Sequence, residues 1–274
     1  ICTPSGLHGD AAIAAANAKK HILVEKPMEI TLEKADAMIQ AARENGVKLG
    51  VISQRRFDPD MRKIKEAVDS GKFGTMVIGD AFIKWFRSQE YYDSGDWRGT
   101  WEFDGGGCLM NQGIHFIDML QWIMGPARKI FARTATRARN IEVEDVAIAN
   151  IEFESGAFGN IVGSTAVYPG LPERLEISGT TGSAVLEKTE LTFWDVEGEE
   201  GGGPIEKTKD TSAAAKDPMK IDASGHQNQF RDFAEAVMDN REPYIPGEEG
   251  RRPVEIILAI YESGKLGKEI SLRS

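Results

Sequence analysis

Cysteine is scarce in this 274-residue chain, and its positive side chains are outnumbered by the negative ones. Only Cys2 and Cys108 occur, too few for the disulfide framework of a small secreted domain, so we expect a reducing compartment and a cytoplasmic protein. Lys and Arg number 33 against 43 Asp and Glu, which gives a net charge of −10. Proteins that bind nucleic acid or anionic membranes generally present a basic face, so we expect neither as a partner.

Long apolar runs and several catalytic motifs are missing as well. No run approaches the roughly 18 apolar residues of a membrane span. The four histidines and two cysteines lack metal-ligand spacing, and no G-x-S-x-G nucleophile elbow occurs, so the sequence predicts neither a bound metal nor a serine hydrolase. The remaining composition, 41% hydrophobic and 28% charged, is typical of a globular protein with one large or two ordinary domains.

The first 56 residues alternate short apolar runs with helical patterns. The segments ICTPS, HILVEK and VKLGVIS resemble strands, and two helical stretches lie between them. Thr31 is the expected N-cap of the second helix, and Gly46 is its expected end. Strand, helix, strand, helix, strand with uninterrupted apolar strands predicts an α/β unit on a parallel sheet over residues 1–56.

Residues 57–274 follow a different pattern. One helix is expected over residues 59–70. Between residues 76 and 187 it is followed by a series of strand-like runs separated by turn signals, and several of these runs alternate apolar and polar residues. This pattern predicts a second, α+β domain with an open, mainly antiparallel sheet and helices on one face. One face of such a sheet is too apolar to stay exposed, so we expect a homodimer or homotetramer formed through it.

The last third of the chain contains one irregular segment and two helices. Residues 195–222 are rich in Gly, Glu and Lys and are expected to form an exposed, mobile excursion. In the first closing helix Phe230 and Phe233 belong to the expected apolar stripe. Pro253 is expected to begin the second closing helix. This helix is assigned to the second domain, with packing back on residues 1–56 as an open alternative.

The segment Glu25-Lys26-Pro27 directly follows the buried strand 22–24. Ligands of open parallel sheets bind at the carboxyl ends of the strands. A lysine held there is partly desolvated, which moves its pKa towards the working range of an acid or base, and Pro27 fixes the turn, with a cis bond as one option. The alternative is a surface lysine after a strand that a proline ends, and position alone leaves both interpretations open.

A second candidate site lies in WRGTWEFDGGGCLMNQGIHFIDMLQW, residues 97–122. The glycine run 105–107 lets the backbone pass close to a ligand or to a neighbouring chain segment. Asn111 and His115 are four residues apart, so they share a face if this stretch is helical, with Asp118 continuing its polar character. The pattern is compatible with a general acid/base unit and equally with a structural histidine. His8 either caps a helix or faces the crevice.

With both segments in view, the chain resembles the glucose–fructose oxidoreductase / inositol dehydrogenase / rhizopine catabolism (Gfo/Idh/MocA) family over essentially its whole length. The resemblance rests on the ordered set CTPSGLH, HILVEKPM, LGVISQRRFDP, WRGTW, DGGGCLMNQGIHFIDMLQW, VEDVAIANIEF and GEEGRRPVEIILAIYESGKLGKEI. WRGTW followed by MNQGIHFID is most similar to members that act on sugars and nucleotide-sugars, including those that oxidise amino-sugar uronates.

The resemblance implies that residues 1–56 are the C-terminal part of a Rossmann domain that binds NAD or NADP. It also implies that the substrate lies against the sheet of the second domain, with Lys26 between nicotinamide and substrate hydroxyl and His115 as the acid/base. The residues implied to bind the cofactor are Thr3, Pro4, Ser5, His8, Glu25, Lys26, Pro27, Gln54, Trp97 and Arg98. Those implied to bind the substrate are Arg98, Trp101, Asn111, Gln112 and Tyr168.

The chain departs from the family pattern in two ways. Many relatives carry Asp where this chain has Asn111; an amide cannot act as a base, so proton transfer would fall to Lys26 and His115. No G-x-G-x-x-G occurs, nor the acidic residue that would choose NAD over NADP, so roughly 60 or more residues are expected upstream, at about 30 for each βαβ unit.

The predicted function is therefore an NAD(P)-dependent oxidoreductase that acts on a secondary alcohol of a sugar, polyol or nucleotide-sugar. The alternatives are a glycosidase that oxidises and reduces a bound nicotinamide within one cycle, and a non-catalytic sugar- or dinucleotide-binding relative.

Overall fold

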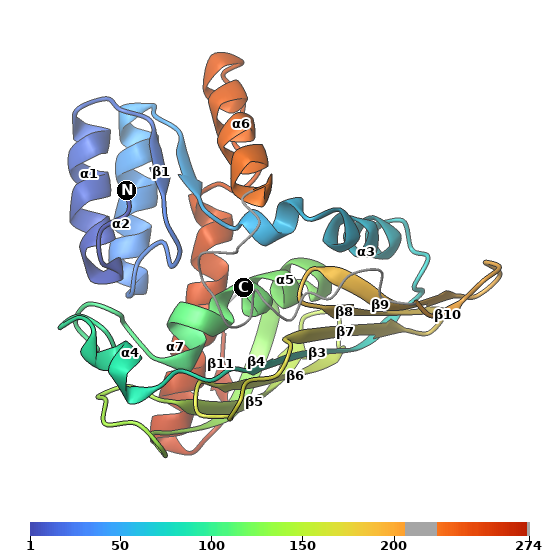
Figure 1. The fold of residues 1–274 in the computed structure, drawn as a ribbon. Helices are drawn as coiled ribbons and strands as arrows, with labels where there is room; N and C mark the ends of the chain where they lie inside the picture. The colour runs from blue at the N-terminus through green and yellow to red at the C-terminus, as the bar shows by residue number, and fades with distance from the viewer. Residues whose placement is uncertain (206–223, 273–274) are drawn as a thin grey trace.

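The computed structural model describes residues 1–205 and 224–272 (Figure 1). The elements of the first part of the chain are η1 (Ser5–Leu7), α1 (His8–Asn17), β1 (Ile22–Val24), α2 (Leu32–Asn45), β2 (Leu49–Val51) and η2 (Gln54–Phe57). The helices that follow are α3 (Pro59–Asp69), α4 (Gln89–Asp93), η3 (Cys108–Gly113), α5 (Ile114–Met124), α6 (Ser224–Met238) and α7 (Gly247–Leu266). The strands that follow are β3 (Met76–Lys84), β4 (Ala127–Ala135), β5 (Val146–Phe153), β6 (Phe158–Ser164), β7 (Arg174–Gly179), β8 (Gly182–Glu187), β9 (Glu190–Val196), β10 (Gly203–Pro204) and β11 (Ile270–Ser271).

The first part of the chain is a parallel α/β unit, as its sequence pattern predicts. Strands β1 and β2 pair in parallel, and α1 packs against α2 beside them (Figure 1). The Thr31 side chain accepts a hydrogen bond from the Lys34 amide, and Gly46 ends α2 in the left-handed conformation, so both predicted helix boundaries are confirmed. No strand is assigned to residues 1–5, but Ile1 exchanges backbone hydrogen bonds with Leu23 and Glu25 alongside β1.

The second part of the described chain is built on a nine-stranded sheet in the order β10-β9-β8-β7-β3-β6-β5-β4-β11. Neighbouring strands are antiparallel except β3 and β6, which run parallel. The prediction of an open, mainly antiparallel sheet is therefore confirmed. Along β3 and β6 burial alternates, with Ala81 and Ile161 facing the helices.

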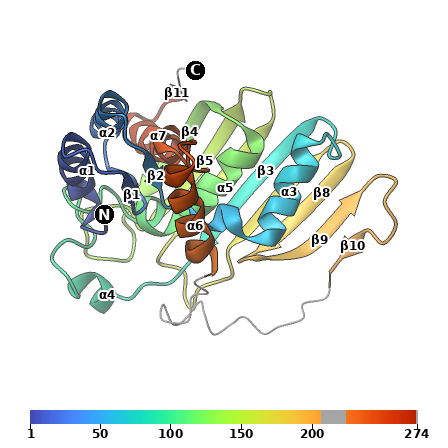
Figure 2. The same ribbon diagram turned by 90° about the horizontal axis from the view of Figure 1, so that it is seen from above.

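The helices lie on one face of this sheet. Figure 2 shows α3 and α5 above the strands, and α7 packs on β4 while it also contacts α2 and β2 of the first part. The core between helices and sheet contains Met61 and Ile64 of α3, and Ile117 of α5. The opposite sheet face is open in Figure 1 and carries exposed apolar side chains, among them Ile148 and Phe158.

The two closing helices differ from the predictions made for them. Helix α7 begins at Gly247, so Pro253 lies inside it rather than at its start. The proline removes one backbone hydrogen bond, and the helix continues because Val254, Ile257 and Ile260 are buried against the rest of the molecule.

Helix α6 stands away from the sheet (Figure 1), and Phe230 on its predicted apolar stripe is 53% exposed. Phe233 of the same stripe is half-buried against Gly50 of β2. The fully buried residues of α6 are Gly225, Gln229 and Ala236, and the Gln229 side chain bonds to the end of β2.

Part of the segment 195–222 is ordered. Its first residues complete β9, residues 197–202 form a mostly exposed turn, and Gly203–Pro204 form β10 beside β9. Residues 206–222 of the predicted excursion lie outside the described residues. Among the residues that the structure describes, no helix is long and apolar enough to cross a membrane. We propose that the two domains comprise residues 1–56 and 57–274, with the boundary inside η2.

Candidate active site

The two predicted catalytic residues lie in one pocket. The pocket is formed where the carboxyl ends of β1 and β2 meet the first turns of α5 and α7. Its lining residues are Lys26, Pro27, Met28, Val51, Ile52, Ser53, Ile114, His115, Asp118, Gly250 and Pro253. A site at the carboxyl ends of parallel strands is where an α/β sheet places ligands.

Lys26 enters the pocket from a cis Lys26–Pro27 peptide directly after β1. Its Nζ donates a hydrogen bond to the backbone oxygen of Asn111 at 3.0 Å. Burial lowers the pKa of the Lys26 amine, while the nearby carboxylates of Glu25 and Asp104 raise it in part. A lysine in this position can exchange a proton at a lower pH than a surface lysine does.

His115 lies in the first turn of α5 and points into the same pocket. Burial holds its pKa well below 6.5, and the positive charges of Lys26, Arg55 and His226 lower it further. Within residues 1–205 and 224–272, no group forms a hydrogen bond with either ring nitrogen. His115 is therefore a neutral imidazole at neutral pH, ready to accept a proton from a ligand in the pocket.

The helical segment before His115 is a π-helix, η3, rather than the α-helix that the four-residue spacing assumed. Its wider turn carries Asn111 and Gln112. The Asn111 side chain donates to the Asp104 carboxylate at 2.9 Å, and Gln112 is 3.4 Å from the Tyr91 hydroxyl. π-Turns inside helices are frequent at functional sites.

The glycine run 105–107 passes close to other segments of the chain itself. A Cβ on Gly107 would overlap the backbone oxygen of Glu144, and a Cβ on Gly106 would overlap the Tyr261 hydroxyl. Gly105, at φ +72°, packs against Ile30. Glycine is therefore needed at these positions for packing, because the segment that begins η3 passes too close to its neighbours for side chains to fit.

Glu144 fixes the start of η3. Its buried carboxylate accepts hydrogen bonds from the amides of Gly107 and Leu109 at 2.8 and 3.0 Å, and from the Tyr261 hydroxyl at 3.0 Å. Burial raises the pKa of Glu144, and these three hydrogen bonds lower it in part. Neither Glu144 nor Tyr261 was predicted as a site residue, because no local signal links them to a helix about 35 residues before Glu144.

Arg98 and Trp97 lie beside η3. The Arg98 guanidinium stacks over the rings of Trp97 and Tyr91, with its carbon 4.4 and 4.5 Å from the ring centroids, and donates to the Tyr91 hydroxyl at 2.7 Å. Since Gln112 approaches the same hydroxyl, two predicted substrate residues are brought together through Tyr91.

Trp101 and Tyr168 do not line the pocket. The Trp101 indole donates to the backbone oxygen of Glu142 and packs edge-on against Tyr261. Tyr168 is 80% exposed and packs edge-on against Phe86. The other predicted substrate residues, Arg98, Asn111 and Gln112, do not line the pocket either, and Asn111 is joined to it through the bond of its backbone oxygen with Lys26.

On the predicted cofactor side, His8 joins two loops. Its ring nitrogens are 2.8 Å from the backbone oxygen of Pro27 and 2.9 Å from that of Thr3, and its side chain is buried. The His8 ring therefore makes no capping hydrogen bond to α1, whereas the backbone of His8 is the C-cap of η1. Pro4 and Ser5, which lie between Thr3 and His8 in the sequence, are partly exposed.

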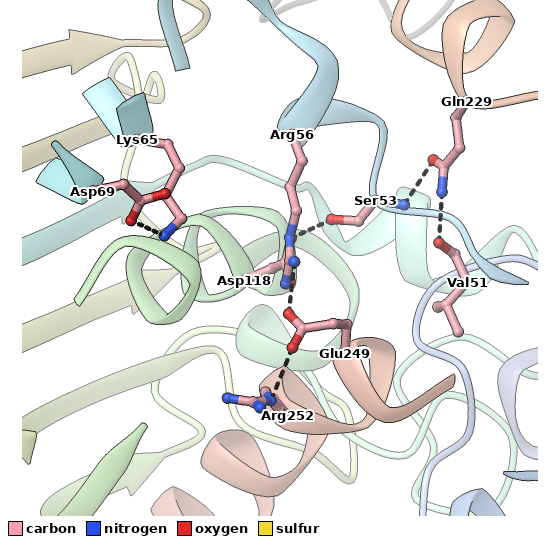
Figure 3. A network of polar contacts seen from close by, with 9 residues as sticks. All are labelled: Val51, Ser53, Arg56, Lys65, Asp69, Asp118, Gln229, Glu249 and Arg252. Atoms are coloured by element: carbon pink, nitrogen blue, oxygen red, sulfur yellow. Dashed lines mark hydrogen bonds and ion pairs between the residues drawn. The ribbon is translucent and has the colours of Figure 1, made fainter. Parts of the chain in front are cut away.

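A buried ionic network lies directly behind the pocket (Figure 3). Arg56 is 1% exposed; its guanidinium bonds Asp118 on α5, with Nε at 2.9 Å, and Glu249 on α7 at 2.8 Å. The Ser53 hydroxyl also bonds Asp118. Asp118 is thereby held as the partner of Arg56, which argues against a role for it in proton transfer.

Gln229 of α6 joins this region to the end of β2 (Figure 3). Its side-chain oxygen accepts from the Ser53 amide at 3.0 Å, and its side-chain nitrogen donates to the backbone oxygen of Val51 at 2.7 Å. Next to Ser53, the side-chain oxygen of Gln54 is buried and has no hydrogen-bond partner within the described residues.

Two family models match the chain on either side of η2. The model described as "Oxidoreductase family, NAD-binding Rossmann fold" matches residues 1–53, and that described as "GFO/IDH/MocA C-terminal domain" matches residues 61–185. The Rossmann-type assignment of the first part follows from this match.

Known proteins resemble the chain over nearly its whole length. An uncharacterized oxidoreductase, YrbE of Bacillus subtilis, is 30% identical over 99% of this chain and 77% of its own length. Myo-inositol 2-dehydrogenase of Thermotoga maritima is 26% identical over 92% of this chain and 72% of its own length. The crystal structure of the WlbA dehydrogenase from Bordetella pertussis, in complex with NADH and UDP-GlcNAcA, is 33% identical, with a TM-score of 0.86, and covers 99% of this chain and 78% of its own.

Proposed function

Because the chain belongs to the GFO/IDH/MocA family of oxidoreductases, we propose that Lys26 and His115 move the proton while a hydride passes between a sugar carbon and NAD or NADP. The chain is an NAD(P)-dependent oxidoreductase. These roles are assigned on one observation. The buried amine of Lys26 and the neutral imidazole of His115, which has no hydrogen-bond partner among the described residues, line the same pocket at the carboxyl ends of β1 and β2.

The residues around the carboxyl ends of β1 and β2 fit a dinucleotide. The side-chain oxygen of Gln54 is a buried acceptor that lacks a partner in the described residues, as expected of a group that a ligand completes. Pro4, Ser5 and Glu25 would bind beside it. When bound, the nicotinamide supplies the acceptor or donor of the hydride.

His115 is suited to take the hydroxyl proton of an alcohol during oxidation, since its neutral form has a free ring nitrogen. Lys26 donates one N–H to the backbone oxygen of Asn111. This hydrogen bond orients the Lys26 amine so that its remaining N–H groups face the pocket. The amine would hold the substrate oxygen and stabilise negative charge as the proton leaves.

For the substrate, we propose a nucleotide-linked sugar that carries a carboxylate, of the class bound by WlbA. The stacked Arg98 guanidinium provides a positive charge beside Gln112 in a chain whose net charge is −10. An extended ligand of this kind also accounts for Trp101 and Tyr168, which could contact only a substrate that reaches beyond the pocket.

The experiment is to mix the chain with NAD⁺ or NADP⁺ and UDP-GlcNAcA, and to follow NADH or NADPH by absorbance. Stoichiometric accumulation of reduced cofactor with UDP-GlcNAcA, and little with myo-inositol or with free N-acetylglucosamine, supports the proposal. Preference for an inositol would reject the nucleotide-sugar assignment and keep the dehydrogenase. Cleavage of a glycoside without accumulation of reduced cofactor would indicate the redox-cycling glycosidase, which the dehydrogenases among the relatives do not favour.

We also propose that the open sheet face joins two or more copies of the chain. Strand register places Phe158 beside Ile78 and Ile148 beside Val162 on this face, and Phe158 is 62% exposed. The polar residues Asp80, Asn160 and Asn150 form a row between these two apolar pairs. Large apolar side chains exposed on an uncovered sheet face are common at protein interfaces. The variant Phe158→Asp should lower the mass measured by sedimentation, whereas an unchanged mass, or a monomeric wild-type chain, would reject the interface.

A further inference from the structure

Asp104 is a buried carboxylate beside the pocket for which the family resemblance and the sequence pattern gave no role. It is 4% exposed and lies in the loop between α4 and η3. Its Oδ1 accepts from the Asn111 side-chain nitrogen at 2.9 Å, and its Oδ2 accepts from the Gly99 amide at 2.8 Å. Both oxygens therefore act as acceptors from N–H groups.

This pairing determines which way the Asn111 amide faces. An ionised carboxylate can only accept hydrogen bonds, so Asn111 must turn its NH₂ group to Asp104 and its Oδ1 to the opposite side. Asn111 thus presents an acceptor, which suits the hydroxyl of an alcohol and not the carbonyl of its oxidised product. Without the carboxylate of Asp104, the Asn111 amide could adopt either of its two orientations.

Asp104 also bears on Lys26. The Lys26 amine is bonded to the backbone oxygen of Asn111, whose side chain is bonded to Asp104. Glu25, at the end of β1, and Asp104 are the two carboxylates that favour the ammonium form of Lys26, and the neutral His115 on α5 also faces this amine. Burial raises the pKa of Asp104, while its two N–H donors and the positive charges of Arg98 and Lys26 lower it in part.

We propose that Asp104 is a positioning residue of the active site, which fixes the Asn111 amide with its oxygen towards the substrate hydroxyl and places a carboxylate beside the residue that holds the Lys26 amine. The effect of Asp104 on catalysis rests on the proposed function. The hydrogen bond between Asp104 and Asn111 and the charge on Lys26 can be tested without any substrate.

The first test is Asp104→Asn. The introduced amide can accept from Gly99 only through its single oxygen, so its NH₂ faces Asn111 and forces Asn111 to present NH₂ to the substrate. We expect kcat/KM for alcohol oxidation to fall about tenfold, mainly through KM, which corresponds to about 1.4 kcal/mol. The exchanged pair Asp104→Asn/Asn111→Asp restores a carboxylate–amide bond and an outward acceptor, and should recover most of the KM.

The second test needs neither cofactor nor substrate. Lys26 is acylated with an amine-selective reagent over a range of pH, and its modification is measured by peptide mass spectrometry. Because Asp104 raises the pKa of Lys26, Asp104→Asn should move the midpoint of modification to lower pH, and the exchanged pair should move it back. Unchanged midpoints would overturn the link between Asp104 and Lys26, whatever the enzyme's substrate proves to be.

The matched control is Glu44→Gln, which removes the charge from a second carboxylate–amide pair, Glu44 with Gln40 at 2.6 Å, on the exposed side of α2. All variants are compared at the same oligomeric state. The control should leave both the KM and the Lys26 midpoint unchanged. If Asp104→Asn and the exchanged pair lose activity equally, with normal thermal unfolding, Asp104 does not act by orienting Asn111 and the proposal fails.

Discussion

The Nζ of Lys26 lies 3.0 Å from the backbone oxygen of Asn111, a residue 85 positions further along the chain. This contact joins the end of a Rossmann-type strand to the π-helix of the second domain. The pocket that contains Lys26 and His115 exists because these two segments meet, so the chemistry of the site depends on how the two parts of the chain are held together.

Replacement of Lys26 by Met tests its role in proton handling. Met keeps the length of the side chain but has no amine to hold the substrate oxygen or to exchange a proton. We expect kcat to fall by about two orders of magnitude or more, in the range of general acid–base contributions, with thermal unfolding little changed. Near-normal turnover would refute the role, and the exposed Lys34→Met should behave as the wild type.

The depressed pKa of His115 predicts a pH dependence of stability. The unfolded chain takes up a proton near pH 6.5 at this residue, whereas the folded chain does so only at lower pH. Unfolding therefore takes up a proton below pH 6.5, and the free energy of unfolding decreases as the pH falls from there towards the folded pKa, by up to about 1.4 kcal/mol per pH unit.

His115→Gln should remove this contribution, so denaturant titrations between pH 4 and 7, roughly, should show a flatter profile than the wild type. The same variant should lower kcat/KM at least about tenfold and abolish the acid limb of its pH profile. If the variant keeps the wild-type pH–rate profile, another group takes the proton.

The Arg56–Asp118 pair predicts a large and specific loss of stability. Arg56→Met leaves the buried Asp118 carboxylate without its guanidinium, which typically costs about 3–5 kcal/mol in the free energy of unfolding. Arg251→Met breaks more exposed ion pairs with Asp36 and Glu255 and should cost about 1 kcal/mol or less. Equal losses in chemical denaturation would show that the buried network is not a principal stabiliser.

Glu144 predicts a change in both stability and activity. Glu144→Gln puts an NH₂ group where Gly107 or Leu109 needs an acceptor, so one buried amide is left unsatisfied at a cost of about 1–3 kcal/mol. Since these amides begin η3, Asn111 and His115 should also lose their alignment, and kcat should fall.

The control for this substitution is Glu248→Gln, which touches only an exposed ion pair with Arg43. It should leave unfolding and kcat unchanged. A stable Glu144→Gln enzyme with normal kcat would show that η3 does not depend on this carboxylate.

Local features of the chain could be predicted from sequence because their causes are local. The cap at Thr31, the glycine end at Gly46 and the parallel strands around them follow from side-chain chemistry and hydrophobic spacing over a few residues. The strand end at Lys26 followed in the same way, since an apolar run that stops at an acid, a base and a proline already marks the edge of a sheet.

The failures have a different cause. Pro253 was taken as a helix start because proline favours that position, yet burial of the residues after it extends α7 across it. The partners Asp104 with Asn111, Glu144 with Gly107 and Arg56 with Asp118 are separated by 7, 37 and 62 residues.

The sequence by itself thus determined the kinds of elements and their order, because periodicity, capping and residue type act within one element. Its resemblance to the family also singled out Lys26 and His115, whose role in proton transfer stays a prediction. Only the tertiary structure decided which polar groups meet, that the glycine run serves close packing, and that a π-turn carries Asn111. Buried hydrogen bonds and ion pairs need specific distances between remote segments, and those distances exist only after the helices have packed on the sheet.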